Sequence, residues 1–368
     1  MEPKITIITA CYNSEEHIEQ SIVSVVQQSY DNIEFIIVDG ASTDRTLEIV
    51  ERYRHKIDRI ISERDQGIYD AYNKGVSVSS GDYIYFLNSD DYLYDRYVIE
   101  KVALEIIKSG ASLKMLYGDV LRTNEFNGYS YLDGQHYQLE QLKRGLKPCT
   151  QGVFFARALF NKYNLFDQQY GIASDFDFMI KVFQDHEEQT VYFPEKIAVF
   201  RLGGLSSNIR TKVLLRKEKM DIIHRHFDEC PLQMYDSSQI NFDFYKKWLE
   251  ILLFKQRPIS SILKEIGVHD VVLFGTVEMS VYVLKDLQAS GIQVHAFLDN
   301  NDKRHGIEMN HVPILPVEWL RQTEQQIDAV ILSYEGNHDE DVKKQINQIV
   351  APRQLRCLNW KEMISMNY

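Results

Sequence analysis

Two adjacent acidic residues, Asp90 and Asp91, follow an apolar stretch of the chain. Residues 83–87 have the length and composition of a buried strand, and open α/β sheets bind ligands beyond the carboxyl ends of such strands. Neighbouring carboxylates repel each other, and burial increases that cost. A divalent cation removes both costs, and oxygen ligands suit Mg²⁺ or Mn²⁺. The pair is therefore either a metal site or a solvated turn after a strand.

A second acidic group, Asp175 and Asp177, opens a segment with apolar residues at helical spacing. The apolar residues of that segment are Phe176, Met179, Ile180 and Phe183. From the residues alone, Ser174 caps this helix and the two acids complement its dipole. These acids acquire a chemical role only if the fold brings them to a binding site.

Alternating strands and helices precede the first acidic pair. Residues 4–10, 33–39 and 59–62 are predicted strands, and residues 15–28 and 45–53 are predicted helices. This order implies parallel strands joined by right-handed crossovers. Polar residues end three of the strands, at Tyr12 and Asn13, at Asp39, and at Asp90 and Asp91. We expect these ends to meet at one edge of the sheet.

The connection between the third and fourth strands, residues 63–75, is rich in polar residues. Gly67 permits a backbone conformation that other residues resist. Lys74 fits either the neutralisation of a phosphate or a solvated position near the end of a helix. A surface loop followed by a capped helix remains the structural alternative for the whole connection.

Four segments of the chain, residues 9–13, 38–44, 65–75 and 87–91, together resemble the family 2 glycosyltransferases. They read TACYN, VDGASTD, DQGIYDAYNKG and LNSDD, and the resemblance covers roughly residues 4–205. It implies the GT-A fold, an α/β domain with a mixed, mainly parallel sheet that binds a nucleotide-sugar. It also implies inversion at the anomeric carbon and a divalent metal, Mn or Mg. The expected donor is a UDP-sugar.

The resemblance also assigns roles to single residues. Those that would line the nucleoside pocket are Thr9, Ala10, Tyr12 and Asn13. Asp39 would accept a hydrogen bond from the base, with Asp65 close by. The other expected substrate-binding residues are Gly67, Asn73, Lys74, Ser89, Asp90, Gln151 and Ser174. Gln151 needs a polar partner, which is either the donor sugar or the backbone.

Asp90 and Asp91 would hold the metal, although Asn88 stands where the family usually has an Asp. Members of the family carry an acidic pair near residue 175, and its second acid is the catalytic base. Ser174 takes the first of these places and Asp175 the second, so Asp175 is the expected base. Asp177 is the fallback.

The chain is expected to contain three parts. Residues 1–210 form the catalytic domain, and residues 211–265 form a helical linker that is basic and aromatic. That linker suits a membrane interface, a homodimer contact or packing against the catalytic domain. Residues 266–368 resemble a small Rossmann-like α/β domain. Because residues 275–280 keep only the first glycine of the dinucleotide fingerprint, we expect no dinucleotide cofactor there.

The composition of the chain argues against several classes of protein and predicts its location. A formal net charge of -12 argues against a general nucleic-acid binder. The four scattered cysteines argue against a disulfide framework or a zinc site, as expected in a reducing cytoplasm. The first strand leaves no room for a signal peptide, and no apolar run reaches membrane-spanning length. A cytoplasmic protein is therefore expected, one that meets any membrane at its inner face.

The expected function is metal-dependent transfer of a sugar to a hydroxyl of a surface-glycan acceptor, such as a capsule, O-antigen or lipid-linked unit. The glycine-rich loop of residues 201–207 would close on the donor diphosphate, or would simply be a linker turn. A non-catalytic scaffold protein is the first alternative, because Asn88 and Ser174 replace expected acids. A sugar nucleotidyltransferase is less favoured, because residues 14–16 are acidic where a basic, glycine-rich loop is needed.

Overall fold

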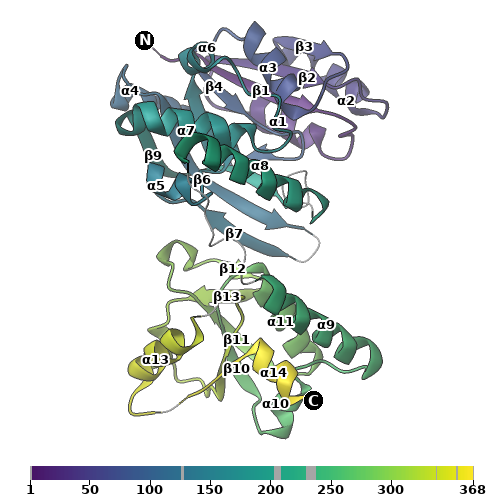
Figure 1. The fold of residues 1–368 in the computed structure, drawn as a ribbon, viewed down its shortest axis with the longest axis vertical. Coiled ribbons are helices and arrows are strands. Elements are labelled where there is room, and N and C mark those ends of the chain that lie inside the picture. The colour runs from purple at the N-terminus through teal and green to yellow at the C-terminus, as the bar shows by residue number, and fades with distance from the viewer. Residues whose placement is uncertain are drawn as a thin grey trace. The chain divides into compact units, whose positions relative to one another are not determined.

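A computed structural model describes residues 2–125, 128–202, 209–228, 238–336, 338–353 and 355–367. The chain divides into two compact units (Figure 1). The first contains Met1–Thr123 and Leu132–Pro231, and the second contains Asn124–Tyr131 and Leu232–Tyr368. The glycines of the expected diphosphate loop, at residues 203–204, lie outside the described residues.

Most of the first unit is built on a nine-stranded sheet with the order β3-β2-β1-β4-β8-β6-β9-β5, in which β7 also pairs with β6; the division between the two units falls within β6 and β7. Its strands are β1 (Ile5–Cys11), β2 (Ile33–Asp39), β3 (Arg59–Ser62), β4 (Tyr83–Phe86), β5 (Tyr92–Leu93), β6 (Met115–Asn124), β7 (Tyr129–Asp133), β8 (Val153–Ala156) and β9 (Thr190–Arg201). The first four strands pair in parallel, as do β6 and β9. β8 pairs antiparallel with β4 and β6, and β5 pairs antiparallel with β9. The predicted mixed, mainly parallel α/β sheet is therefore confirmed.

The register of this sheet aligns the ends of its first strands. Cys11 pairs with Asp39, and Asp39 pairs with Ser62. The chain leaves β4 beside the end of β1, where the Leu87 N–H donates to the carbonyl of Ile8 at 3.0 Å. The polar residues that follow these strands therefore start from a common edge.

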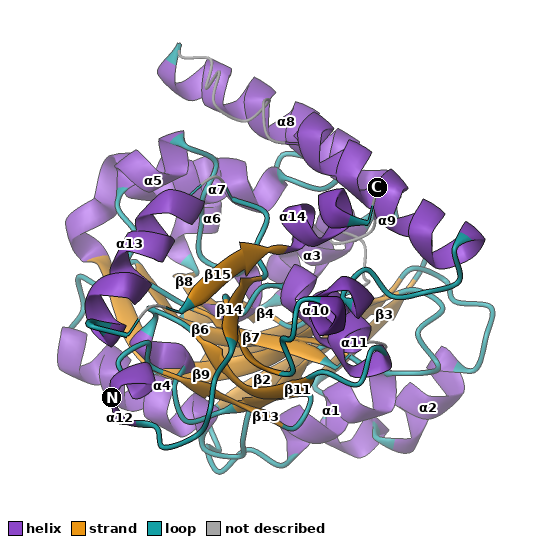
Figure 2. Ribbon diagram, turned by 90° about the horizontal axis from the view of Figure 1, so that it is seen from below, coloured by secondary structure: helices purple, strands orange, loops and turns teal. Residues whose placement is uncertain are grey.

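Helices connect the strands of this sheet along the chain, and Figure 2 distinguishes helices from strands by colour. They are α1 (Ile18–Val26), α2 (Thr46–Arg52), α3 (Ile68–Val78), α4 (Val98–Ser109), α5 (Leu139–Lys143), α6 (Ala158–Tyr163), α7 (Ser174–His186) and α8 (Ile209–Phe227). Buried aromatic rings join several of them. Tyr72 of α3 lies 4.4 Å from Phe86 of β4, and Phe160 of α6 lies 4.6 Å from Phe178 of α7, measured between ring centroids. Since aromatic pairs bury large areas, this cluster fixes α3 relative to the start of α7.

The second unit has a six-stranded sheet with the order β12-β13-β11-β10-β14-β15, parallel except for the pair β12 and β13. Its strands are β10 (Asp270–Phe274), β11 (Gln293–Leu298), β12 (Glu308–Met309), β13 (Val312–Leu315), β14 (Ala329–Leu332) and β15 (Arg356–Asn359). Its helices are α9 (Ser238–Phe254), α10 (Ser261–Glu265), α11 (Glu278–Ala289), α12 (Trp319–Gln322), α13 (Asp339–Val350) and α14 (Trp360–Met366).

The helical segment that precedes this sheet divides between the two units. α8 belongs to the first unit, and α9 belongs to the second, where the ring of Tyr245 stacks 5.3 Å from that of the buried Trp360. No helix in the described part of the chain has both the length and the apolar character needed to cross a membrane.

Candidate functional site

Asp39 organises the turn that follows β2. Its carboxylate is fully buried, and it accepts hydrogen bonds from the Ser42 N–H at 3.1 Å, the Ser42 hydroxyl at 2.5 Å and the Ser62 hydroxyl at 2.7 Å. Both carboxylate oxygens are thus engaged by neighbouring serines. A side chain held in this way shapes the edge of the sheet.

Tyr12, Gly40 and Asp65 come together at this edge. A Cβ atom on Gly40 would lie 2.5 Å from Asp65 Oδ2 and 3.4 Å from Tyr12 Cδ2, so a larger residue there would displace the Asp65 carboxylate. The ring of Tyr12 is 61% exposed, which leaves a face available to a flat ligand. Asn13 adopts a left-handed φ of 48°, and its Oδ1 atom accepts the Thr43 N–H at 2.9 Å.

Thr9 and Ala10 lie in β1 and are almost completely covered. The Thr9 hydroxyl has no hydrogen-bond partner among the described residues. Ser89 lies close to the loop after β1, because its hydroxyl pairs with that of Ser14 at 2.8 Å. Of the residues expected to line the nucleoside pocket, Tyr12 and Asn13 are therefore exposed, and Thr9 and Ala10 are buried.

Residues that were expected to bind substrate form hydrogen bonds and ion pairs within the connection before α3. Gly67 has a φ of 123° at the N-cap of α3, a conformation that favours glycine, and its N–H donates to Asp65 Oδ1 at 3.0 Å. Lys74 forms ion pairs with Glu63 at 2.9 Å and Asp70 at 3.4 Å. Lys74 lies inside α3 with 23% of its side chain exposed, so it is held by these two acids and is not a solvated residue at the end of the helix.

Asn73 holds a neighbouring segment. Its amide donates to the Phe166 carbonyl and accepts from the Phe166 N–H, both at 2.9 Å, and its side chain is buried. A pocket of about 420 Å³ is lined by Asn73, Tyr163, Asn164, Leu165, Phe166, Asp167, Gln168 and Lys181. Asn73 therefore lines this pocket and binds the backbone of Phe166.

Asp91 and Asp90 occupy different surroundings. Asp91 is fully buried, with Oδ1 accepting the Arg201 N–H at 2.8 Å and Oδ2 accepting the Asn88 amide at 3.0 Å. Asn88 in turn accepts the Tyr72 hydroxyl at 2.5 Å. Asp90 is partly buried, and no other described residue donates a hydrogen bond to its carboxylate. The side chain of Asp90 is thus the one left open to a ligand.

Both carboxyl groups are costly to ionise in this place. Burial raises the pKa of Asp91 well above its usual range, and the charge of Asp90 raises it further. Burial also raises the pKa of Asp90, against the opposing charges of His17 and Arg201. A bound cation would remove this cost.

The donor set fits a hard divalent ion that is completed by phosphate oxygens and water. Among the described residues there is no group of three or more His, Cys, Asp or Glu side chains that could hold a metal. Mg²⁺ commonly binds through one or two carboxylates together with substrate phosphates, which two neighbouring acids can satisfy. Asp90 and Asp91 are the residues that would hold such an ion.

Asp175 lies at the start of α7 in a dense hydrogen-bond network. Its Oδ1 atom accepts the Tyr69 hydroxyl at 2.9 Å and the Phe176 N–H at 2.8 Å. Its Oδ2 atom accepts the Lys147 ammonium at 2.6 Å and the Thr150 hydroxyl. Burial acts to raise the pKa of Asp175, but the charge of Lys147 and these hydrogen bonds together lower it below its usual range.

Lys147, Thr150 and Tyr69 are the residues that sequence reasoning missed. Lys147 and Thr150 lie 28 and 25 positions before Asp175, and Tyr69 lies 106 positions before it. No motif spacing links such distant positions. Tyr69 does fall within the segment 65–75 that carried the family resemblance, which is the one signal that pointed to it.

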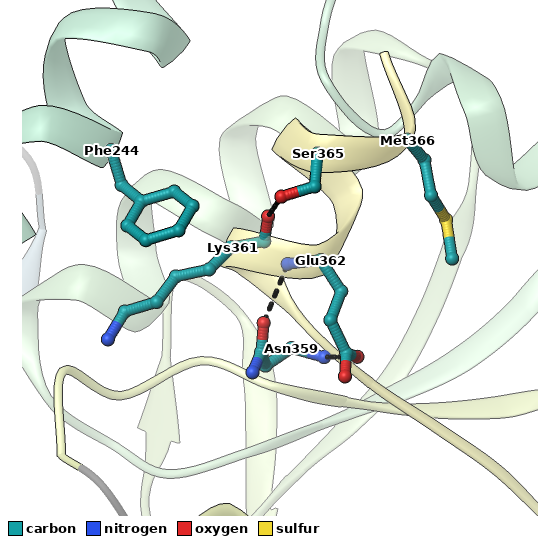
Figure 3. A pocket seen from close by; sticks show the side chains of 6 residues that line it. All are labelled: Phe244, Asn359, Lys361, Glu362, Ser365 and Met366. Carbon is teal, nitrogen blue, oxygen red and sulfur yellow. Dashed lines mark hydrogen bonds between the residues drawn. The ribbon is translucent and has the colours of Figure 1, made fainter. Parts of the chain in front are cut away.

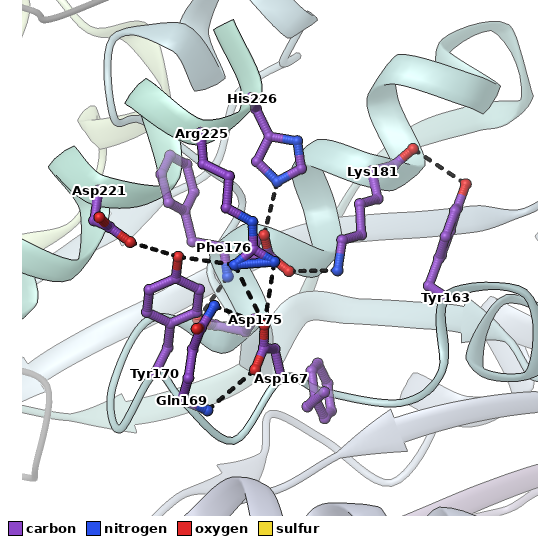
Figure 4. Close-up of polar contacts among 12 residues, drawn as sticks. Tyr163, Asp167, Gln169, Tyr170, Asp175, Phe176, Lys181, Asp221, Arg225 and His226 are labelled. Atoms are coloured by element: carbon purple, nitrogen blue, oxygen red, sulfur yellow. Dashed lines mark hydrogen bonds and ion pairs between the residues drawn. The ribbon is translucent and has the colours of Figure 1, made fainter. Parts of the chain in front are cut away.

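Asp177 serves to join two helices. It forms ion pairs with Lys181 at 2.6 Å and with His226 of α8 at 2.7 Å, and its side chain is buried. Figure 4 shows Arg225 and His226 reaching from α8 toward this region, where Arg225 lies 3.2 Å from Asp167. These contacts give Asp177 a structural role.

Ser174 is the first residue of α7, and Ala173 occupies the N-cap. The alternative in which Ser174 caps the helix is therefore wrong. Glu218 of α8 anchors the segment that leads into α7, since its carboxylate accepts the N–H groups of Gly171, Ile172 and Ala173, each at 2.9 Å. The buried Ser174 hydroxyl has no hydrogen-bond partner among the described residues.

Gln151 lies in a short 3-10 helix (Thr150–Gly152) next to Thr150 and is 5% exposed. Its backbone carbonyl accepts the Tyr85 hydroxyl at 2.7 Å, and its side-chain Oε1 accepts the Cys149 thiol at 3.4 Å. Part of its polar capacity is thus satisfied within the protein.

Replacement of Glu218 by Ala should lower the free energy of unfolding by about 2–4 kcal/mol, because buried N–H groups before α7 lose their acceptor. Urea unfolding of the whole chain measures this. Lys217→Ala, at an exposed position on the same helix, should change the value by less than about 0.5 kcal/mol. Equal effects from the two variants would contradict the anchoring role of Glu218.

A pocket of about 490 Å³ lies in the second unit between α9 and α14 (Figure 3). Its lining residues are Phe244, Asn359, Lys361, Glu362, Ser365 and Met366. The Asn359 amide oxygen accepts the Glu362 N–H at 2.7 Å, which caps α14. None of the residues expected at the functional site lies in this pocket.

Comparison with known proteins identifies the family. The family described as glycosyl transferase family 2 matches residues 6–162. The chain is 32% identical over 223 residues to a PGL/p-HBAD biosynthesis glycosyltransferase of Mycobacterium tuberculosis (strain ATCC 25177 / H37Ra), which is 59% of this chain and 85% of that relative. It is 29% identical over 147 residues to glycosyltransferase GlyG of Streptococcus pneumoniae serotype 4, which is 39% of this chain and 48% of GlyG.

A solved structure shares the fold. The crystal structure of S. aureus TarS 1-349 superposes with a TM-score of 0.50 and 19% sequence identity, covering 70% of this chain and 74% of that one. This likeness concerns the fold alone, and it agrees with the GT-A fold that the sequence predicted. On the strength of the family match and the mycobacterial relative, the chain belongs to glycosyl transferase family 2 and is a glycosyltransferase.

Proposed function

We propose that this enzyme moves a sugar from a UDP-sugar to a hydroxyl group of a glycan acceptor, with inversion at the anomeric carbon. The observation that carries the proposal is the contrast between two acids. Asp90 receives no hydrogen bond from another described residue, whereas Asp175 receives four donors, one of them the Lys147 ammonium at 2.6 Å. The open carboxylate of Asp90 suits the binding of a cation. The contacts of Asp175 suit a carboxylate that is kept ionised for proton transfer.

The donor base would bind where Tyr12, Gly40 and Asp65 meet. The exposed ring of Tyr12 offers a stacking face. Asp39 is engaged by Ser42 and Ser62, so it would act by holding the turn. The Gly67 N–H binds only Oδ1 of Asp65. Oδ2 accepts no hydrogen bond from another described residue, so this oxygen suits the N–H of a uracil. We therefore assign base reading to Asp65 with support from Asp39.

The donor diphosphate would lie beyond the end of β4, beside Asp90 and Asp91. A Mg²⁺ or Mn²⁺ ion held by these carboxylates would neutralise the diphosphate and stabilise the departing UDP. Arg201 is fixed there by its own hydrogen bonds, through its N–H to Asp91 at 2.8 Å and its guanidinium to the Asp90 carbonyl at 2.5 Å. Its charge adds to the positive potential at this place.

The chemical step needs one base. As the acceptor oxygen forms its bond to the anomeric carbon, the bond from that carbon to UDP breaks on the opposite face. Asp175 takes the proton of the acceptor hydroxyl, so no charge is left on the new glycosidic oxygen. A single displacement of this kind inverts the configuration and requires no covalent enzyme intermediate.

The acceptor would be a surface glycan or its lipid-linked precursor. The mycobacterial relative is named as a glycosyltransferase of PGL/p-HBAD biosynthesis, and the acceptor class proposed for this chain rests on family analogy. In the second unit, Leu253 and Phe254 at the end of α9 are 65% and 81% exposed, with Lys255 next to them. This combination suits contact with the inner face of a membrane, and a homodimer contact is the other use of the same surface.

We further propose that the second unit is a Rossmann-like domain without a dinucleotide. The parallel strands lie in the order β13-β11-β10-β14-β15, which follows the doubly wound Rossmann order up to its fifth strand. Asp299, the acid after β11, is already paired with Arg304 at 3.2 Å and accepts the Thr276 hydroxyl. A ribose would have to displace both partners.

A panel of nucleotide-sugars tests the proposal directly. Thermal shift and release of nucleoside diphosphate are measured with Mn²⁺ and with EDTA, using UDP-, GDP- and dTDP-sugars. We expect a UDP-sugar to stabilise the protein and to release UDP only when metal is present, and NMR of the product should show the inverted anomer. A non-catalytic scaffold would release no diphosphate in either condition.

A further inference from the structure

Four protein donors surround the carboxylate of Asp175, so the acceptor hydroxyl would have to replace one of them before Asp175 could take its proton. A carboxylate offers about four lone-pair positions, and here each oxygen accepts two donors. Tyr69 and the Phe176 N–H serve Oδ1, and Lys147 and Thr150 serve Oδ2. Lys147 is the donor among them that carries a charge.

Lys147 is held firmly in this position. Its ammonium contacts three acceptors, namely Asp175 Oδ2 at 2.6 Å, Thr150 Oγ1 at 2.8 Å and the Pro148 carbonyl at 3.3 Å. Only 17% of its side chain is exposed. Pro148 follows it directly and restricts the backbone of Lys147 to extended conformations. The charge is therefore placed against Asp175 by the local chain.

Other groups around Asp175 cannot replace this charge. Tyr69 and Tyr72 come from α3, and burial raises the pKa of each well above its usual range, so both stay neutral. Lys219 comes from α8 and donates to the Gly145 carbonyl at 2.8 Å. Burial, followed by the charge of Lys147, lowers the pKa of Lys219 to about 8. Among the described residues, Lys147 is thus the cation in direct contact with the carboxylate.

We propose that Lys147 is a positioning residue that keeps Asp175 ionised and oriented for proton transfer. This inference rests on the proposed function, in which Asp175 is the base. Burial alone would favour the protonated acid, which cannot accept a proton. With Lys147 in contact, the ionised form persists toward acidic pH. Without it, the protonated form should extend to higher pH.

The first experiment needs no substrate. The ¹³Cγ resonance of Asp175 is titrated by NMR in the full-length protein and in Lys147→Gln, and Asp175→Asn identifies the signal. Gln keeps N–H donors but removes the charge, whereas Lys147→Arg keeps the charge. We expect the midpoint in the wild-type protein to lie below that of an ordinary aspartate, and to rise in Lys147→Gln but not in Lys147→Arg.

The second experiment follows UDP release against pH with the donor that the panel identifies. Lys147→Gln should lower kcat/KM by about tenfold at the acidic end of the range and by less than about twofold at the alkaline end. Lys162→Met is the matched control, because Lys162 lies at the same 2.6 Å from Asp185 but in an exposed pair. It should leave the profile unchanged.

An equal loss at every pH, or an unchanged midpoint for Asp175, would overturn the role of Lys147. If Lys147→Gln does not fold, the wild-type titration decides, since an ordinary or raised midpoint for Asp175 refutes the inference. Full activity of Asp175→Asn would instead refute the proposed base and leave the measured effect of Lys147 on ionisation standing. The two failures are therefore distinguishable.

Discussion

Asp175→Asn is expected to lower kcat for sugar transfer by about 10³-fold while the affinity for the UDP-sugar changes by less than about twofold. Asn has nearly the same shape but cannot accept the proton of the acceptor hydroxyl, and general-base catalysis contributes about 10² to 10⁴ in rate. Single-turnover transfer measures the chemical step, and calorimetry with the donor measures binding. Near-normal turnover would remove Asp175 from the role.

Asp177→Asn is the matched control for this variant. Asp177 lies two positions further along α7 and pairs with Lys181 and His226. Since removing one partner of a buried ion pair leaves the other uncompensated, we expect a loss of about 3 kcal/mol in unfolding free energy and little change in kcat of the folded fraction. A loss of catalysis at unchanged stability would move the base to Asp177.

The pH dependence of stability should reflect the same two acids. In the folded state, burial opposes ionisation of Asp177, but His226 and Lys181 together lower its pKa, as Lys147 does for Asp175. A depressed carboxyl pKa stabilises the fold at pH above the unfolded value of about 4, and this contribution is lost as the pH falls through the folded value. The urea concentration at the unfolding midpoint should therefore decrease when the pH is lowered below 4. The decrease should be smaller in Asp177→Asn.

The edge of the first sheet was predictable because its signals are local. The predicted strands end at residues 10, 39 and 87, and these ends align in the register of the sheet. The polar residues that follow the strands therefore start from one edge of the sheet, as expected. The adjacent acids Asp90 and Asp91 could be found in the same way. Their unequal surroundings could not, since those depend on Arg201, which lies 110 positions after Asp91.

The surroundings of Asp175 were beyond sequence reasoning for a physical reason. They are assembled from α3, the segment before β8 and α8, which share no period or motif. α8 lies in the segment expected to be a helical linker, for which packing against the catalytic domain was one alternative, but the sequence did not indicate that its Glu218 anchors the backbone before α7. The sequence also does not say which polar residues of a family motif bind a ligand and which hold the fold together. Asn73, for example, binds the backbone of Phe166.

Asp90→Ala and Asp91→Ala should separate metal binding from stability. Asp90 accepts no hydrogen bond from another described residue, so its removal should leave the unfolding free energy within about 0.5 kcal/mol. It should nevertheless lower metal-stimulated UDP release by at least about 10²-fold, because the open carboxylate is lost. Asp91→Ala removes the acceptor of the Arg201 N–H and the Asn88 amide, which should cost about 1–3 kcal/mol in stability.

Manganese binding in the presence of UDP, measured by electron paramagnetic resonance and by thermal shift, distinguishes the two acids. Burial raises the pKa of both carboxyl groups, so each ionises only at higher pH than an ordinary aspartate and a cation must compete with protons. The thermal shift caused by manganese should therefore grow as the pH rises from 5 to 8 in the wild-type protein and vanish in Asp90→Ala. Retained manganese binding in Asp90→Ala, with binding lost in a folded Asp91→Ala, would make Asp91 the ligand. In that case the buried network around Asn88 and Arg201 would have to open before the donor could bind.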